Sequence, residues 1–488
     1  MSLVRKSLTS ASAAIVLSGG RFLLMAILAR RFSSTALGQF AYAQWLVDIA
    51  FMVCAFGING SASRYIAEYT SDPKRKAVFI RHWWPLALLL PVLSGIGVVG
   101  GARFSGLTLT PQGYAMLAAW AVASGWMAMQ TGALCGHQRF DLILKSNLSF
   151  IAIIIPLVLV IPINANSQIL LFSAMALSSL LASWFGIQQN IKSVIGFNVA
   201  PTVKISWSNI RRYTINVWLT GLLGGLVWSR GELPLVHAHL GAQGVAQYTV
   251  ALTLFFGAMQ GIMLWVSGVA PHLTSEWGSG RKTQALATAR KFSDVQLLVS
   301  SCAALLLTCF GPELLEMIFG PIYLASSHPL AILLLGLITL SASAQNHLLQ
   351  IDTDARFTRN TSLVGLVILY FIASIAIPWF GVPGAAISRT FTMWSMFLIS
   401  IIFVLRSWGN AAISVRNIIV AVCVVLVPAL MLANGINSYL IRTIIGFTCL
   451  MTLVLLIHSE NGELVAIDIG NRVLIHLRRW VTPGRQAS

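Results

Sequence analysis

The chain has 488 residues, of which 57% are hydrophobic and only 9% are charged, and its mean hydropathy is +0.80. Soluble domains carry about 25% charged residues, so this composition excludes a water-soluble enzyme, a nucleic-acid-binding protein and a disordered scaffold. The formal charge of +18 comes from 32 Lys and Arg against 14 Asp and Glu. In a membrane protein, such an excess is typical of cytoplasmic loops and of contacts with anionic headgroups.

Fourteen apolar segments follow one another along the chain, and each is about as long as the roughly 20 residues of a membrane-spanning helix. They are 10–30, 39–60, 83–101, 112–135, 147–164, 168–188, 212–232, 243–266, 292–311, 326–348, 361–380, 384–405, 415–433 and 437–457. A spanning β-strand needs only about 9–11 residues and alternates in polarity. The sequence therefore predicts an all-α polytopic membrane protein with about 14 transmembrane helices.

The distribution of basic residues predicts how these helices are oriented. With a cytoplasmic N-terminus, most of the 32 Lys and Arg fall in cytoplasmic segments. Those at the opposite helix ends are Arg30, Arg31, Arg103 and Arg230, and those inside predicted spans are Arg21, Arg389 and Arg442. By the positive-inside rule, both termini are predicted to be cytoplasmic. We interpret Arg442, at the start of the last span, as an anchor whose side chain extends to the membrane surface.

The sequence contains no pattern that indicates catalysis. The six cysteines lie in or beside apolar segments without a Cys-x-x-Cys spacing, so we interpret them as buried apolar side chains. No metal-ligand spacing, nucleophile triad or phosphate-binding loop is present. We therefore expect a transporter and not an enzyme, with no cofactor and no metal, driven by an ion gradient, the membrane potential or downstream consumption of the product.

Two short stretches of the first half recur in the second half. Residues 36–43 (ALGQFAYA) align with 244–251 (GVAQYTVA), and 147–149 (NLS) align with 360–362 (NTS). Transporters are often built from such repeats. We predict one six-helix bundle in 1–200, a second in 201–408, two additional spans in 409–457 and a basic cytoplasmic tail in 458–488. Two like-oriented bundles would enclose a central cleft that opens to alternate sides by rocking.

Four further stretches carry a family resemblance. They are ARRF followed by GQF in 29–40, ELP followed by LG and VAQY in 232–248, IFGPIY in 318–323 and PWFGVPGAAI in 378–387. In this order and spacing they resemble polysaccharide flippases of the multidrug/oligosaccharidyl-lipid/polysaccharide (MOP) exporter superfamily. The resemblance covers about residues 8–405, and it departs from the family pattern at Ser33 and Ala246, where Gly is common.

The resemblance implies transport of a lipid-linked oligosaccharide across the bacterial inner membrane. Its substrate would be an undecaprenyl-diphosphate-linked repeat unit for O-antigen lipopolysaccharide, capsule or exopolysaccharide. Its partners would be the lipid bilayer and, by analogy, the polysaccharide polymerase and chain-length regulator of the same pathway. No nucleic acid is expected among them.

Charges inside the predicted spans are the candidates for function. Arg21 and Asp48 lie about 13 Å from the outer ends of spans 1 and 2. They either form a buried ion pair that holds the spans together, or Arg21 binds the diphosphate while Asp48 acts as an exchangeable partner. Arg230 and Arg389 are further candidates for substrate binding, although Arg389 could also extend outward to the membrane surface. Glu232 and Asp48 are candidates for coupling to a proton or cation, with an interfacial position as the alternative for Glu232.

Other functions remain open at this point. A cation-coupled multidrug exporter of the same superfamily would favour acidic groups in the cleft, whereas the charges here are mostly cationic and favour an anionic substrate. A membrane polysaccharide polymerase or ligase would usually carry a large outer loop, and the predicted outer loops are all short. A peptidoglycan-precursor flippase is a nearer alternative, because its substrate is also a polyprenyl diphosphate. Uncharged residues that could line the cleft are Trp45, Gln130, Asn216, Trp228, Gln260 and Asn346.

Overall fold

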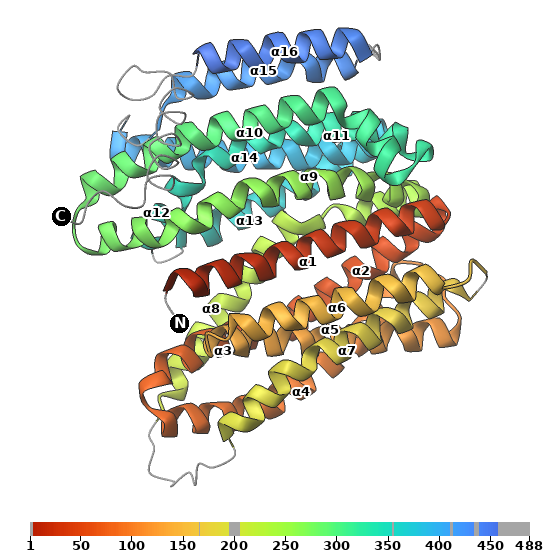
Figure 1. Cartoon of the computed structure of the whole chain (residues 1–488), viewed down its shortest axis with the longest axis vertical. Coiled ribbons are helices and arrows are strands. Elements are labelled where there is room, and N and C mark those ends of the chain that lie inside the picture. Colours follow the sequence, from red (N-terminus) through yellow and green to blue (C-terminus); the bar gives the residue numbers. More distant parts are fainter. Residues whose placement is uncertain are drawn as a thin grey trace, which may run out of the picture. The chain divides into compact units, whose positions relative to one another are not determined.

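The computed structural model describes residues 3–164, 166–194, 205–353, 356–409, 413–433 and 439–456, and within these residues the regular structure is entirely helical. Helices occupy all fourteen predicted segments (Figure 1), so the predicted all-α membrane fold is confirmed. Among the described residues, ten helical stretches are long and apolar enough to cross a membrane. One of these, Trp207–Met263, is 57 residues long and contains two predicted spans. The predicted tail at 458–488 lies outside the described residues.

The chain divides into two compact units, Met1–Thr253 and Leu254–Ser488. We refer to them as the N-terminal and the C-terminal unit. The predicted subdivision at residues 200, 408 and 457 stays a prediction.

The N-terminal unit consists of helices that follow one another along the chain. They are α1 (Leu3–Arg31), α2 (Ser34–Cys54), α3 (Ile58–Glu68), η1 (Tyr69–Ser71), α4 (Pro73–Phe104), α5 (Pro111–Gly136), α6 (Phe140–Val160), α7 (Ser167–Val194), α8 (Trp207–Gly225), the π-helical turn η2 (Leu226–Arg230) and the first part of α9 (Leu233–Gly278). Within it, α5 packs against α3, α4 and α7, and α1 packs against α6.

Local sequence explains where several of these helices begin. The side chains of Ser33 and Thr110 accept hydrogen bonds from Ala36 N (3.3 Å) and Gly113 N (3.1 Å), respectively. Such hydroxyl caps satisfy backbone N–H groups that have no partner within the helix. Because Ser33 caps α2, this helix begins five residues before the predicted start at residue 39.

The predicted span 39–60 is not one continuous helix. Phe56 and Gly57 adopt positive φ angles of 44° and 70°, which end α2 and redirect the chain into α3. One face of α3 then packs closely on α5, because Gly132 and Gly136 have no side chains to hold the two backbones apart.

The C-terminal unit continues from α9 through a second set of helices. They are α10 (Lys282–Phe319), η3 (Pro321–Ser326), α11 (Ser327–Leu334), η4 (Leu335–Ala342), α12 (Ser343–Asp352), α13 (Arg356–Phe380), α14 (Val382–Trp408), α15 (Val415–Ala433) and α16 (Tyr439–Leu456). The predicted span 326–348 is thus occupied by α11, η4 and most of α12. Helices α15 and α16 pack against α10 and against each other.

Buried polar contacts attach this last helix pair to α10. Asn417 Nδ2 of α15 donates to Asp294 Oδ1 (2.9 Å). Arg442 of α16 is only 6% exposed, donates to the carbonyl oxygen of Cys309 (2.9 Å) and forms an ion pair with Glu313. The interpretation of Arg442 as a surface anchor was therefore wrong, because Glu313 on the same side of the unit supplies a partner for its charge inside the protein.

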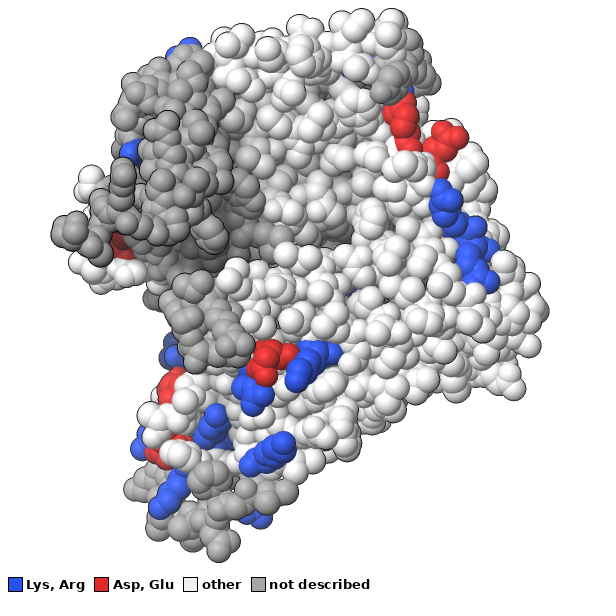
Figure 2. All heavy atoms as spheres, viewed as in Figure 1, with Lys and Arg blue, Asp and Glu red and all other residues white. Residues whose placement is uncertain are grey.

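Figure 2 shows where charged side chains lie on one face of the molecule. The visible Lys, Arg, Asp and Glu gather toward the ends of the helices, and a broad uncharged surface covers their middle. A surface of this kind is suited to the hydrocarbon region of a bilayer, which excludes charged groups.

Candidate functional site

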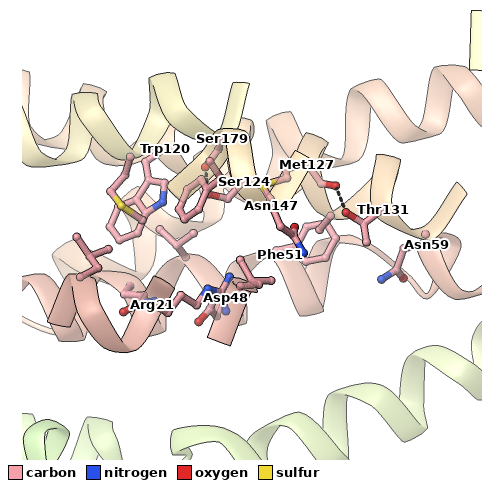
Figure 3. A pocket seen from close by; sticks show the side chains of 18 of the residues that line it. Arg21, Asp48, Phe51, Asn59, Trp120, Ser124, Met127, Thr131, Asn147 and Ser179 are labelled. Atoms are coloured by element: carbon pink, nitrogen blue, oxygen red, sulfur yellow. Dashed lines mark hydrogen bonds between the residues drawn. The ribbon is translucent and has the colours of Figure 1, made fainter. Parts of the chain in front are cut away.

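A cavity of about 470 Å³ lies inside the N-terminal unit. Its walls come from α1, α2, α3, α5, α6 and α7 (Figure 3), and most of its lining is apolar. Polar and charged side chains face it at a few places, which Figure 3 shows as labelled sticks. This cavity is the candidate functional site because it brings together intramembrane charges that lie far apart in the sequence.

Arg21 and Asp48 both line the cavity, and both side chains are exposed within it. Arg21 lies about 15 Å from the end of α1, at 1.5 Å per residue, and Asp48 lies about 21 Å from the start of α2. The early start of α2 places Asp48 about one turn deeper than the sequence predicts. The two residues nevertheless come together at the same cavity (Figure 3), as the sequence predicted.

The charges at this site are unequal in number. The carboxylate of Asp48 is attracted by the guanidinium groups of both Arg21 and Arg230. No direct hydrogen bond joins Arg21 and Asp48 in the part of the chain that the structure describes. Arg21 lines the cavity and Arg230 does not, but the charge of each acts on Asp48. Two positive charges that act on one carboxylate leave a net positive charge, which can attract an anion to the cavity.

Arg230 reaches this cluster from an irregular part of the chain. It is the last residue of η2, a π-helical turn that joins α8 to α9. Such turns are rare and are frequent at functional sites, because they change the direction of the side chains that follow. The sequence singled out Arg230 by its position at a helix end but gave no sign of the π turn.

Glu232 lies two residues further along and does not line the cavity. Its side chain is completely buried and accepts a hydrogen bond from the hydroxyl group of Tyr248, which is also completely buried. Nearby in the same unit, the ring of His237 stacks on Tyr42 at 4.0 Å. Glu232 is thus buried inside the protein, and both its role in coupling and the alternative of an interfacial position stay predictions.

Arg389 belongs to the C-terminal unit and does not line this cavity. It lies on α14, is 2% exposed, and its guanidinium group is 5.4 Å from the centre of the Phe256 ring. A cation over an aromatic face is attracted by the ring electrons. The burial excludes the alternative that Arg389 extends to the membrane surface, and a role in substrate binding stays a prediction.

The cavity also contains uncharged polar groups that the sequence analysis missed. Asn147 Nδ2 donates to the carbonyl oxygen of Ala13 (2.9 Å), and the hydroxyls of Ser124 and Ser179 are 3.3 Å apart. Such residues are common in apolar helices, so only position in space distinguishes them. The one available signal was the NLS stretch at 147–149, which includes Asn147 and recurs at 360–362.

None of the six uncharged residues expected at a cleft lines this cavity. Gln130 is instead buried between helices, where its Oε1 accepts a hydrogen bond from Asn190 Nδ2 at 2.8 Å. Among the described residues, no group of three or more His, Cys, Asp or Glu is placed to hold a metal ion.

Three solved structures show what class of protein has this fold. Lipid II flippase MurJ, in an inward closed conformation, is similar with a TM-score of 0.66 and 13% identity, over 92% of this chain and 98% of that chain. An inward-facing multidrug resistance MATE family transporter has a TM-score of 0.56 and 16% identity, over 83% and 94% of the two chains. A MOP superfamily transporter from Pyrococcus furiosus has a TM-score of 0.58 and 16% identity, over 84% and 95%. The fold is that of MOP-type transporters.

A match to a family of sequences makes the assignment more specific. Residues 3–275 match the polysaccharide biosynthesis protein family, which is more than half of the chain. The chain therefore belongs to the polysaccharide biosynthesis protein family. A comparison with curated protein sequences found no match.

Proposed function

We propose that this protein flips an undecaprenyl-diphosphate-linked oligosaccharide repeat unit across the bacterial inner membrane, for the synthesis of a surface polysaccharide, by alternating access. Family membership and the flippase among the similar structures support this proposal. The observation that carries it is that Arg21 and Asp48 line a cavity within apolar helices, with the positive charge of Arg230 also acting on Asp48. The orientation with both termini in the cytoplasm, and association with a polymerase and a chain-length regulator, belong to the same proposal.

The chemistry of the substrate explains why such a cluster is needed. A diphosphate cannot enter the hydrocarbon region without groups that replace its water, since unpaired polar groups there are costly. Guanidinium groups match phosphate oxygens with paired hydrogen bonds. Arg21 would hold the diphosphate in the cavity, and the positive charge of Arg230, which lies outside the cavity lining, would add to the attraction.

Asp48 has a role in release under this proposal. While the site is empty, its carboxylate partly neutralises the two guanidinium groups. An incoming diphosphate displaces this internal counter-ion, and Asp48 returns when the substrate leaves. Competition of this kind keeps binding weak enough for turnover, because an uncompensated charge inside the membrane would otherwise retain the substrate.

A cation-coupled multidrug exporter is the second candidate function, and Asp48 is the observation that favours it. The carboxylate faces the cavity, where it could attract a cationic drug. The two arginines weigh against this reading, since they repel cations from the same place. For the similar transporter from Pyrococcus furiosus, reverse polarity of the binding pocket suggests a different function, so pocket charge is a reasonable criterion in this superfamily.

A binding measurement on the purified full-length protein distinguishes the two. We expect undecaprenyl diphosphate to bind more tightly than undecaprenyl monophosphate. Arg21→Ala should weaken the binding of undecaprenyl diphosphate by about tenfold to a hundredfold, which is the usual cost of losing charge-assisted hydrogen bonds. Arg21→Lys should weaken this binding by less. Arg30→Ala is the matched control, because Arg30 lies on the same helix outside the cavity. Equal affinity of wild type and Arg21→Ala, or tight binding of the cation ethidium that Asp48→Asn abolishes, would contradict the flippase proposal.

A further inference from the structure

A second cavity, of about 640 Å³, lies on the N-terminal unit between α3, α4 and the start of α8. We call it the α4–α8 groove. Aromatic and aliphatic side chains form most of its wall, among them Phe56, Phe79, Trp83, Leu86 and Trp207. The groove reaches the surface, because Leu86 is 44% and Trp207 is 42% exposed. An apolar hollow on the outside of a membrane protein is accessible to lipid chains.

The groove is separate from the candidate functional site. Helix α3 stands between them: Asn59, Gly60 and Ser63 line the central cavity, whereas Ile58 and Ser61 line the groove. A molecule bound at Arg21 could not also occupy the groove without passing through α3. We therefore expect the groove to bind a molecule other than the transported substrate.

The polar part of the groove is basic. Among the described residues, its lining includes Arg211 and His82 and no acidic side chain. Arg211 is exposed and forms no hydrogen bond or ion pair with any residue that the structure describes. The His82 ring is 4.8 Å from the ring of Trp207, and its Nδ1 is 2.9 Å from the carbonyl oxygen of Val78. The guanidinium group of Arg211 is thus available to an anionic ligand beside an apolar slot.

The position of the groove along the helices corresponds to a membrane boundary. Trp83 and Trp84 stand where α4 changes from a basic start to an apolar run, and Trp207 is the first residue of α8. Tryptophan is enriched at the level of lipid headgroups, where one side of the ring is apolar and the other is wet. Both helix starts belong to the predicted cytoplasmic side, whose leaflet carries anionic lipids.

We propose that the α4–α8 groove binds an anionic phospholipid of the cytoplasmic leaflet. One acyl chain lies along the aromatic wall between α4 and α8, and the headgroup phosphate accepts hydrogen bonds from Arg211. A lipid bound there contacts α3, α4 and α8 together, and so stabilises the attachment of α8 to the rest of the N-terminal unit.

Native mass spectrometry of the full-length protein in nonionic detergent tests this proposal with phosphatidylglycerol as the probe. Phosphatidylcholine and inorganic phosphate serve as comparison ligands. We expect one saturable phosphatidylglycerol site, weaker binding of phosphatidylcholine, and no protection from thermal unfolding by inorganic phosphate alone. Arg211→Ala should weaken the binding of phosphatidylglycerol by about fivefold, which is the effect of removing one basic residue beside an anionic lipid. Arg211→Lys should restore most of this binding.

Two further variants separate this site from general surface charge. Arg212 is also exposed but does not line the groove, so Arg212→Ala should bind phosphatidylglycerol like wild type. Leu86→Trp places a large side chain into the slot from an exposed position and should prevent binding while Arg211 remains. Equal weakening by Arg211→Ala and Arg212→Ala, unchanged binding in a folded Leu86→Trp variant, or tighter binding of undecaprenyl phosphate than of phosphatidylglycerol would overturn the proposal.

Discussion

Glu232 is the buried carboxyl group of the N-terminal unit that transport could use for coupling. Its partner is the hydroxyl group of Tyr248, and neither side chain is exposed. An ionisable group held inside a membrane protein is a candidate for proton transfer, because its charge changes the energy of the helices around it. If Glu232 couples transport to protons, the carboxyl group itself is required and not only its hydrogen bond.

The variant Glu232→Gln tests this role. The amide oxygen can still accept from Tyr248, so we expect a folded protein of nearly unchanged size and thermal stability. We expect substrate transport in sealed membrane vesicles to lose its acceleration by an imposed proton gradient. The coupling role is excluded if the variant responds to the gradient as wild type does.

His137 gives a second prediction, which concerns stability and not transport. It follows the end of α5, outside the spanning helix, and its Nε2 is 3.1 Å from Asn190 Oδ1. Burial, with the positive charges of Lys76 and Arg139, lowers the pKa of His137 to about 4, although the hydrogen bond to Asn190 opposes this shift. The ring is therefore neutral in the folded protein at neutral pH.

The pH dependence follows from this lowered pKa. An unfolded histidine has a pKa of about 6.5, so between about pH 6.5 and 4 the unfolded state binds more protons than the folded state. The free energy of unfolding should fall as the pH is lowered through this range and should not change through His137 above it. We expect the thermal unfolding midpoint of His137→Gln to fall less than that of wild type between about pH 7 and pH 5. An identical fall in both proteins would show that other groups control acid stability.

At the scale of single residues, the sequence predicts charges better than it predicts their surroundings. Arg21 and Asp48 were identifiable because a charge within an apolar run is rare. Asn147 and Ser179 were not, since amides and hydroxyls are common in such helices. Arg442 was misinterpreted because its partner Glu313 lies beyond the predicted end of the preceding apolar segment. Pairing between distant helices depends on packing that no local pattern contains.

At the scale of helices, α2 and the start of α9 approach each other closely at Gly38 and Ala242. A methyl group added at Gly38 would collide with the backbone carbonyl oxygen of Ala242. Gly38 belongs to the stretch 36–43, and Ala242 lies just before the similar stretch 244–251. The first recurring stretch therefore lies, at Gly38, against a residue just before the second stretch, at a place where glycine is required.

The variant Gly38→Ala should consequently be destabilised. A backbone atom cannot rotate out of the way, so α2 and α9 must separate, and such overpacking costs about 1–3 kcal/mol. Gly100→Ala on α4 is the control, since no heavy atom lies within 4 Å of its added methyl group, and alanine there should be neutral or stabilising. Thermal unfolding of the purified variants measures both. Equal stability of Gly38→Ala and wild type would mean that the helices do not approach this closely.

The apolar segments predict where helices lie, but they do not predict where a helix is interrupted. The run 39–60 is mostly apolar, yet it contains the break at Phe56 and Gly57. That break gives α3 its own direction, so that one side lines the central cavity and another lines the α4–α8 groove. A single glycine in an apolar segment is too common to predict such a turn, because glycine is frequent inside membrane helices.

For the whole molecule, composition determines the class of protein and the family match determines its relatives. The low charge content predicted a helical membrane protein, and the order of four motifs predicted its relation to proteins of polysaccharide biosynthesis, the family to which the chain belongs. The fold does not determine the substrate, because transporters with this fold include a flippase and multidrug transporters. We expect the substrate to depend on the charge of the cavity, which Arg21 and Asp48 line.

We propose that this protein moves a lipid-linked oligosaccharide between leaflets and that Arg21 binds this lipid. The most direct measurement is the sidedness of that lipid in a strain without the gene, complemented with wild type, Arg21→Ala or Arg30→Ala at equal folded levels. We predict accumulation on the inner leaflet that wild type and Arg30→Ala clear and Arg21→Ala does not. A normal distribution in the strain without the gene, with no redundant flippase and unchanged polymer yield, would contradict the account.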